Sequence, residues 1–360
     1  MRTPFAERRR ALRKELAAVQ LDSLLLSDPA NLYYLTGFTG EAGALIVSAA
    51  GCTLVTDGRF KVQASEETSG IRIVLQKGAL FSSAGEVLRA ARKQTVGFDP
   101  NRLTVAQLRT LRKTSGARCR WKAAPGLTEH LRSRKDAQEL AQMRRAAILA
   151  GDVLERAIRL LKPGVREQEI AGEIEYQMRK RGASGPSFET IVAFGERTAL
   201  PHARPTAKRL RKNELVVLDL GAILAHYCSD ITRTVFMGRA PKRIRRWYGA
   251  VLEAQSAAIA AVKAGAACGD VDAAARGVLA SCRLEGHFVH STGHGLGLEV
   301  HEDPRIARGQ KRRLEPNNVI TVEPGVYFAG VGGIRIEDDV VVHADRSEVI
   351  TRVPRDLIEL

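Results

Sequence analysis

The sequence has few aromatic residues, few cysteines and no long uncharged apolar run, and each shortage excludes a class of protein. Only 5% of its 360 residues are Phe, Trp or Tyr, too few for an evident platform that stacks nucleic-acid bases. No stretch approaches the roughly 18 apolar residues of a membrane span, and the basic N-terminus lacks the apolar core of a signal peptide. The cysteines form no Cys-x-x-Cys pair, so neither a disulfide framework nor a zinc–cysteine site follows. Reduced thiols in a cytoplasmic protein are the expectation for all five: Cys52, Cys119, Cys228, Cys268 and Cys282.

The charge of the chain is strongly positive, with a formal net charge of +16. Such a charge is compatible with a nucleic-acid partner. The basic residues nevertheless fall in separated clusters at expected loop or helix boundaries, namely 8–10, 132–135, 208–212, 242–246 and 311–313. Because no nucleic-acid-binding motif accompanies them, they indicate a solvated surface, and we expect no specific nucleic-acid partner.

The first part of the chain alternates between helix-like and strand-like segments. Leu12, Leu16 and Val19 form a helical apolar stripe within 5–20. Short runs typical of strands occupy 23–26, 44–47, 52–56 and 71–75, and segments 83–93 and 104–113 again have helical character. This pattern predicts an α/β domain over residues 1–126, followed by a linker at 127–135.

The second part, residues 136–360, contains an internal duplication. Two helices, the first ending at Pro163-Gly164, precede VVLDLGAI and DITRTVF, and the same order returns after Pro241 and ends in VITVEPGVY and IRIEDDVVV. Equivalent positions keep a nearly constant offset, which predicts a pseudo-twofold domain in which each half contributes a β-hairpin. The offset is 106 for Asp136 and Lys242, 104 for Asp219 and Glu323, and 107 for Asp230 and Glu337.

Four acids lie in or beside the expected strands of this duplication. Asp219 and Glu323 stand within apolar runs, where an uncompensated carboxylate is costly to bury. The partner strands add Asp230 and Glu337, and four converging carboxylates call for one or two divalent cations. The alternative is that Arg233 and Arg335 pair with these acids as core ion pairs, but two arginines cannot neutralise four carboxylates.

Four histidines occur where they could serve the same site. They are His202 in LPHAR and His290, His294 and His301 in HSTGHGLGLEVHE, where glycines surround His294 closely. A nitrogen ligand among carboxylates suits Mn²⁺, Fe²⁺, Co²⁺ or Zn²⁺ better than Mg²⁺ alone. The remaining histidines are interpreted as ordinary core or surface residues: His130, His226, His287 and His343.

Taken together, DLGA, SDITRT, HSTGHGLGLEVHE, TVEPGVY and GIRIEDD resemble the pita-bread metallopeptidases in the branch of aminopeptidase P and prolidase. The similarity covers about residues 134–360. NLYYLTGFTG and TDGRF resemble the smaller creatinase-like domain of the bacterial members. The implied fold class is therefore α/β (α+β), with an N-terminal creatinase-like domain and a C-terminal pita-bread domain over 136–360.

The resemblance also implies a site of two divalent metal ions, with Mn²⁺ expected and Co²⁺ or Zn²⁺ as alternatives. Asp219 would chelate one metal, Asp230 and Glu337 would bridge both, and His294 with Glu323 would complete the second. A water shared by the two metals would attack the scissile carbonyl, with Glu323 carrying the proton to the leaving nitrogen. His301 and His290 would stabilise the oxyanion. The resemblance further matches His202, His290 and His301 to substrate-binding histidines, and Arg335 to an arginine beside the bridging glutamate.

The expected activity is a metal-dependent Xaa-Pro aminopeptidase that releases the residue before a proline, as a homodimer acting on peptides with proline in second position. The alternative is an Xaa-Pro dipeptidase, or prolidase, that cleaves dipeptides. Methionine aminopeptidase would not need the N-terminal 125 or so residues, and creatinase, which shares the fold, works without metal. A more remote alternative is a non-catalytic pita-bread module whose basic surface binds nucleic acid or a protein. The complete ligand set argues against it.

Overall fold

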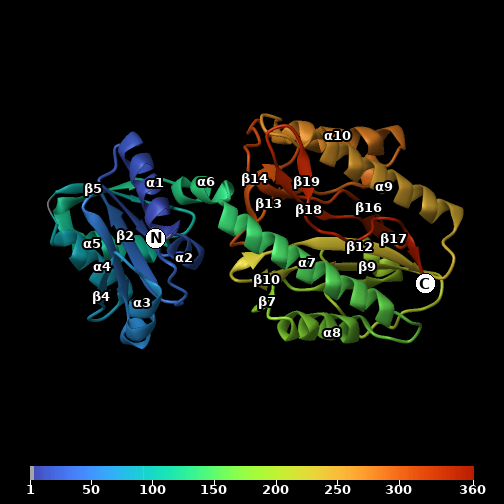
Figure 1. Cartoon of the computed structure of the whole chain (residues 1–360), viewed down its shortest axis with the longest axis horizontal. Helices are drawn as coiled ribbons and strands as arrows, with labels where there is room; N and C mark the ends of the chain where they lie inside the picture. The colour runs from blue at the N-terminus through green and yellow to red at the C-terminus, as the bar shows by residue number, and fades with distance from the viewer. Residues whose placement is uncertain (1–3, 92) are drawn as a thin grey trace. The chain divides into compact units, whose positions relative to one another are not determined.

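The computed structural model describes residues 4–91 and 93–360, and the chain divides into two compact units between Arg132 and Ser133 (Figure 1). The segment expected to be a linker, 127–135, contains this boundary and is largely helical, as α6 (Leu127–Ser133). Among the described residues, none of the helices is both long and apolar enough to cross a membrane. All five cysteines are free, and four of them are buried.

The N-terminal unit is built on a six-stranded sheet in the order β4-β3-β2-β1-β5-β6. Strand β1 pairs antiparallel with β2 and parallel with β5, so the sheet is mixed. Helices α4 and α2 both pack against β2, and the core contains Leu25, Val55 and Leu88. The strands are β1 (Ser23–Leu26), β2 (Gly43–Ser48), β3 (Gly51–Thr56), β4 (Arg72–Leu75), β5 (Gln94–Phe98) and β6 (Cys119–Ala123), and the helices are α1 (Pro4–Ala18), α2 (Pro29–Thr36), α3 (Lys61–Glu67), α4 (Leu80–Arg89) and α5 (Val105–Ser115), with the 3₁₀ turns η1 (Gly58–Phe60) and η2 (Gly116–Arg118).

The first half of the C-terminal unit consists of a helix pair and an antiparallel sheet. Asp136 begins α7 as an N-cap, and its carboxylate accepts hydrogen bonds from the backbone N–H groups of Gln138 and Glu139. The apolar faces of α7 and α8 pack against strands β8, β9 and β12, around residues such as Leu154, Ile174 and Val216. The elements are α7 (Ala137–Leu160), α8 (Glu167–Lys180), β7 (Gly185–Pro186), β8 (Ile191–Phe194), η3 (Gly195–Ala199), β9 (Glu214–Leu220), β10 (Ala222–Leu224), β11 (Tyr227–Cys228) and β12 (Ile231–Met237).

The second half repeats this plan with α9 and α10. Both helices pack over a core that includes Val251, Val271 and Ile320. Strand β15 pairs with β13 and β18, as β9 pairs with β8 and β12 in the first half. The elements are α9 (Lys242–Ala261), α10 (Cys268–Ser281), η4 (Glu285–His287), β13 (Gly293–Gly295), β14 (Glu302–Ile306), β15 (Val319–Val322), β16 (Gly325–Phe328), β17 (Gly332–Arg335), β18 (Asp338–Val342), β19 (Ser347–Val349) and β20 (Ile358–Glu359).

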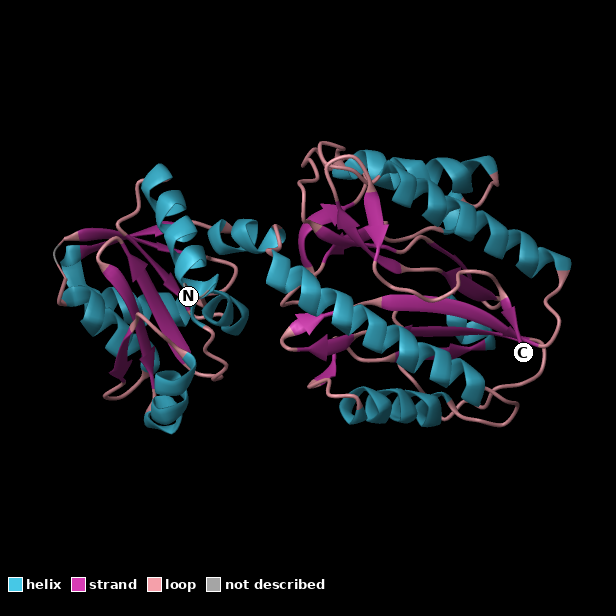
Figure 2. Ribbon diagram, in the orientation of Figure 1, coloured by secondary structure: helices cyan, strands magenta, loops and turns pink. Residues whose placement is uncertain are grey.

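The two helix pairs lie on opposite sides of the central strands, with α7 and α8 on one side and α9 and α10 on the other (Figure 2). This arrangement agrees with the predicted pseudo-twofold plan and confirms the predicted fold class. Because β9 with β12 and β15 with β18 are antiparallel pairs from the two halves, acids at their ends come from both halves.

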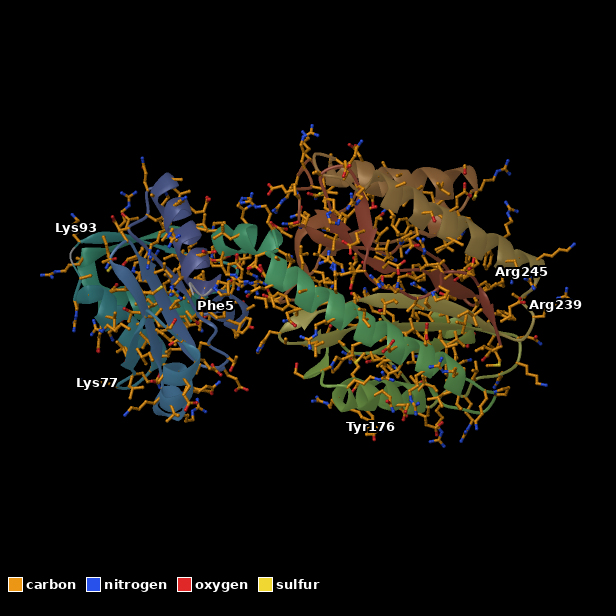
Figure 3. All side chains as sticks on the ribbon, viewed as in Figure 1. Phe5, Lys77, Lys93, Tyr176, Arg239 and Arg245 are labelled. Atoms are coloured by element: carbon orange, nitrogen blue, oxygen red, sulfur yellow. The ribbon has the colours of Figure 1, made fainter. Side chains whose placement is uncertain are left out.

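The basic residues that Figure 3 labels extend into solvent. In the N-terminal unit they are Lys77 and Lys93, and in the C-terminal unit Arg239 and Arg245. Arg245 forms an ion pair with Glu359 at 2.7 Å.

Candidate metal centre

The four acids predicted from the sequence lie at the ends of strands in the centre of the C-terminal unit. Asp219 is in β9, and Asp230 directly precedes β12. Glu323 follows β15, and Glu337 precedes β18. Asp219, Asp230 and Glu337 are at most 6% exposed. Each hairpin therefore places two carboxylates in a poorly solvated interior.

The ring of His294 completes this cluster. Possible ligand atoms of Asp230, His294 and Glu337 all lie within 4.8 Å of one another. The Nε2 atom of His294 is 3.5 Å from Glu323 Oε1 and 3.9 Å from Asp230 Oδ2. Its Nδ1 donates a hydrogen bond to the backbone oxygen of Gly295 at 3.0 Å, which directs the Nε2 lone pair at the acids. Burial lowers the pKa of His294 to about 4, so the ring is neutral, as a metal ligand must be.

Close backbone packing explains the glycines around His294. A Cβ atom at Gly293 would lie 1.9 Å from the carbonyl oxygen of Thr321, and one at Gly295 would lie 2.2 Å from that of Asp303. Strand β13 can therefore approach its neighbours only with glycine on both sides of the histidine.

Repulsion among the acids dominates the electrostatics of the cluster. Burial, followed by the charges of Glu337 and Asp219, raises the pKa of Asp230 well above its usual range. Burial, followed by the charge of Glu323, likewise raises the pKa of Glu337 well above its usual range. Burial raises the pKa of Glu323 to about 7, although Arg335 opposes this shift. Without added positive charge, these carboxylates cannot all be ionised at neutral pH.

Of the two arginines in the competing interpretation from the sequence, Arg233 and Arg335, the described structure pairs only Arg335 with a carboxylate of the cluster. Arg335 binds Asp219 through Nη2. Arg233 turns away from the four acids and pairs with Asp338 at 2.8 Å. Among the described residues, Asp219 Oδ1 and Asp230 Oδ1 are buried without a hydrogen-bond partner. Buried carboxylate oxygens without partners, beside a neutral imidazole, are the donor set that a divalent transition metal takes, so the residues fit the implied ions.

The other predicted histidines lie around this cluster. His202 and His301 are exposed, and the ring of His301 stands 4.4 Å from that of His294. Burial of part of the His301 ring lowers its pKa, and the nearby charge of His202 lowers it further. Burial lowers the pKa of His290 to about 4, with Arg335 and His202 also contributing. The structure thus brings His290, His294 and His301 together near the acids, and it places Pro201, the neighbour of His202, within hydrogen-bond distance of Arg335.

Sequence reasoning missed Tyr327, which connects His290 to the acids. His290 Nδ1 donates to the backbone oxygen of Ser291 at 2.8 Å, so its Nε2 accepts a hydrogen bond from the Tyr327 hydroxyl at 2.8 Å. That hydroxyl in turn accepts from Arg335 Nη1 at 2.7 Å. Burial raises the pKa of Tyr327 to about 12, so it remains protonated. Its place four residues after Glu323, in TVEPGVY, was the only signal in the sequence.

Three further polar residues orient the acids. The Thr232 hydroxyl donates to Glu337 Oε2 at 2.6 Å, and the Thr321 hydroxyl donates to Glu323 Oε1 at 3.3 Å. Asp339 Oδ2 accepts the backbone N–H of Asp230 at 3.1 Å. These contacts hold the acids in place before any ion binds.

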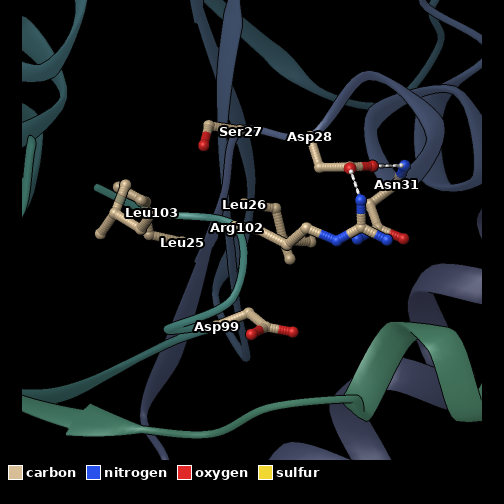
Figure 4. A pocket seen from close by; sticks show the side chains of 8 residues that line it. All are labelled: Leu25, Leu26, Ser27, Asp28, Asn31, Asp99, Arg102 and Leu103. Atoms are coloured by element: carbon tan, nitrogen blue, oxygen red, sulfur yellow. Dashed lines mark hydrogen bonds and ion pairs between the residues drawn. The ribbon is translucent and has the colours of Figure 1, made fainter.

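The N-terminal unit contains a separate pocket where β1 and β5 end (Figure 4). Asp28 lies in it and accepts hydrogen bonds from the backbone N–H of Asn31 and from Arg102. Asp99 accepts the backbone N–H groups of Asn101 and Gly126. Because the carboxylates already have partners and no predicted site residue lines this pocket, it is not the candidate site.

Two family models account for nearly all of the chain. Residues 141–344 match metallopeptidase family M24, and residues 8–134 match the creatinase/prolidase N-terminal domain. The chain belongs to metallopeptidase family M24. It is therefore a peptidase of a family that uses divalent metal ions, as the sequence predicted.

Proteins named as dipeptidases and a protein named as an aminopeptidase are similar to this chain over nearly its full length. An Xaa-Pro dipeptidase of Pyrococcus furiosus is 33% identical, covering 98% of this chain and 99% of the relative. The structure of an Xaa-Pro dipeptidase from Bacillus anthracis matches with a TM-score of 0.94 and 36% identity, covering 99% and 100%. That of an X-Pro aminopeptidase from Thermotoga maritima matches with a TM-score of 0.88 and 32% identity, covering 96% and 100%.

Proposed function

We propose that this M24 enzyme hydrolyses the peptide bond before a proline at the second position of its substrate, with dipeptides as the principal substrates. The observation that carries the metal-dependent chemistry is the buried cluster of Asp219, Asp230, His294, Glu323 and Glu337, with two carboxylate oxygens that lack partners. The preference for proline is supported by similarity alone. Xaa-Pro dipeptidases at 33% and 36% identity support the shorter substrate as much as the 32% identical X-Pro aminopeptidase supports the aminopeptidase expected from the sequence.

The proposed metal ligands follow the sequence prediction. Asp219, Asp230 and Glu337 would hold the first of two ions, and Asp230, Glu337, His294 and Glu323 the second. Mn²⁺ is the proposed metal, with Co²⁺ or Zn²⁺ as alternatives. When bound, the ions supply Lewis acidity that activates water and polarises the scissile carbonyl.

The protein's own residues then carry the remaining steps. The Glu323 carboxylate accepts a proton from the attacking water and returns it to the leaving nitrogen of proline. The exposed ring of His301 donates a hydrogen bond to the carbonyl oxygen as negative charge develops there. His202, also exposed, binds the substrate at the rim.

The role proposed for His290 changes in the light of its contacts. Both ring nitrogens are already engaged, by the backbone oxygen of Ser291 and by Tyr327. His290 therefore holds the Tyr327 hydroxyl, which contacts Arg335, and through it the orientation of Asp219. This assigns oxyanion stabilisation to His301 rather than to His290.

The aminopeptidase is the second candidate, and the 32% identical X-Pro aminopeptidase favours it. The deciding experiment measures hydrolysis of Ala-Pro, Ala-Pro-Ala and Ala-Ala by metal-stripped protein, with and without Mn²⁺, Co²⁺ or Zn²⁺. Metal-dependent cleavage of Ala-Pro alone establishes the dipeptidase, and cleavage of Ala-Pro-Ala establishes the aminopeptidase. If Ala-Ala is cleaved as fast as the proline peptides, the proline assignment is wrong.

A matched pair of variants tests the location of the site. Asp230→Asn removes a proposed ligand, whereas Asp303→Asn removes an exposed carboxylate that pairs with Arg312 at 2.7 Å. We expect only the first to abolish metal binding in calorimetric titration. Equal metal affinities in the two variants would place the ions elsewhere.

A further inference from the structure

The carboxylate of Glu167 connects both ends of the segment that carries His202. Glu167 begins α8 and is fully buried. It accepts the backbone N–H of Phe194 at 2.9 Å, and the backbone N–H and hydroxyl of Thr206 at 2.8 and 2.6 Å. Arg197 Nε lies 3.0 Å from the same carboxylate, and its Nη2 donates to the backbone oxygen of Arg204 at 2.6 Å. One side chain therefore fixes both ends of segment 195–205 and an arginine within it.

Asp272 binds the segment that carries His290 through a comparable set of contacts. It lies in α10, is 1% exposed, and accepts the hydroxyl and backbone N–H of Thr292 at 2.8 and 3.3 Å. Its other oxygen pairs with Arg276 Nε at 2.7 Å. Arg276 then donates to the backbone oxygens of His290 and Phe288, at 2.7 and 3.3 Å.

The two acids play comparable parts in the two halves without being equivalent positions. Helices α8 and α10 begin at Glu167 and Cys268, so Asp272 lies about one turn further into its helix than Glu167 does. Each acid lies on the second helix of its half, binds one arginine and one threonine, and fixes a segment that carries a histidine beside the metal cluster. A buried ion pair contributes little net stability compared with well-packed apolar residues, so folding alone does not account for both.

We infer that Glu167 and Asp272 are positioning residues that hold His202 and His290 at the rim of the metal centre. Neither touches the acids of the centre, and each acts through the segment it binds. The expected effect on activity rests on the proposed function, in which His202 binds substrate and His290 holds the Tyr327 hydroxyl that contacts Arg335.

The inference predicts different kinetic effects for the two acids. His202 is an exposed binding group, so Glu167→Gln is expected to raise the KM for Ala-Pro about fivefold and to change kcat less than twofold. His290 is linked through Tyr327 and Arg335 to Asp219, so Asp272→Asn is expected to lower kcat about fivefold with a smaller change in KM.

Amide hydrogen exchange tests the positioning role independently of activity. In the Mn²⁺-loaded protein, we expect Glu167→Gln to accelerate exchange in 195–205 and Asp272→Asn to accelerate it in 288–292, each leaving the other segment unchanged. The control is Glu348→Gln, which breaks an ion pair with Arg144 in the same unit, 2.7 Å long, and should alter neither segment.

Milder variants keep the test decisive if removal of an acid prevents folding. Thr206→Val and Thr292→Val each delete one hydroxyl donor and leave the acid in place, and smaller effects of the same pattern are expected. Exchange that matches the Glu348→Gln control in every variant would overturn the inference. If the wild-type enzyme cleaves no proline peptide, the proposed function fails, while the exchange measurements still decide whether the two acids hold their segments.

Discussion

Two neighbouring acids at the start of strand β18, Glu337 and Asp338, compare a carboxylate that faces the proposed metal site with one that serves the fold. Asp338 is fully buried and contacts Arg233, Gln255 and Thr351, each within 2.8 Å. Glu337, one residue earlier, has the hydroxyl of Thr232 as partner and lies among three other acids. Successive side chains of a strand point to opposite faces, so the two carboxylates enter different environments. Both acids are buried, so what distinguishes them is their surroundings: Asp338 has three polar partners, one of them an arginine, whereas Glu337 has one and faces other acids.

Removing an acid of the metal centre should produce the largest functional loss. In Asp230→Asn, we expect the metal-dependent rate of proline-peptide hydrolysis to fall about 10³-fold or more, because a ligand shared by both proposed ions is lost. The metal-free variant should be more stable than metal-free wild type, by about 1 kcal/mol, because one of four repelling carboxylates is gone. Activity assays and urea unfolding measure the two effects. A metal-free variant that is less stable than wild type would contradict the comparison.

Asp338, on the opposite face, should show the reverse pair of effects: its removal should lower stability and leave metal affinity unchanged. Asp338→Asn leaves the Arg233 guanidinium buried without its counter-charge, and breaking a buried pair in this way costs about 3–5 kcal/mol. Urea unfolding of the metal-free protein should show this loss. Metal affinity per folded molecule should remain close to that of wild type, which separates this variant from Asp230→Asn.

The pH dependence of stability provides a third contrast. Burial raises the pKa of Glu323 from 4.5 to about 7 and raises those of Asp230 and Glu337 in the same direction. The folded metal-free protein therefore binds more protons than the unfolded chain above pH 4.5, and its free energy of unfolding should fall as pH rises toward 7. Saturating Mn²⁺ should remove this loss, because the ion binds the deprotonated acids of the folded state.

Urea unfolding at pH 5 and pH 8, with and without Mn²⁺, measures this dependence. The Asp230→Asn variant serves as the control, because it should show a shallower fall. Equal stability of metal-free wild type at both pH values would contradict the raised pKa values.

The offsets of the duplication predicted which acids converge, because equivalent strand positions must meet in a pseudo-twofold sheet. The strand at 23–26 was predicted to its ends. Helix α2 was not predicted, although Asp28 and Pro29 form a helix-start signal, with Asp28 accepting the backbone N–H of Asn31. The direction of Arg233 depends on which face of its strand turns inward and on Asp338, which is 105 positions away. The contacts of Tyr327 depend on His290 and Arg335, which lie on other segments, 37 and 8 positions away. A single sequence contains no direct signal for such contacts.

The smallest expected effect concerns an ion pair that is neither in the core nor at the metal centre. Glu348 accepts hydrogen bonds from Arg144 and His343, which lower its pKa from 4.5 to about 2. A lowered pKa stabilises the folded protein above pH 4.5, and that contribution is lost as pH falls toward 2. Because a third of the Glu348 side chain is exposed, Glu348→Gln should cost only about 1 kcal/mol at pH 7. Urea unfolding should show that the difference in free energy of unfolding between wild type and variant becomes smaller as pH falls from 4.5. This trend is the reverse of the one expected for the acids of the metal centre. If the stability difference between wild type and variant grew as pH fell, the folded protein would favour protonated Glu348. The contrast between paired and unpaired acids would then fail at this site.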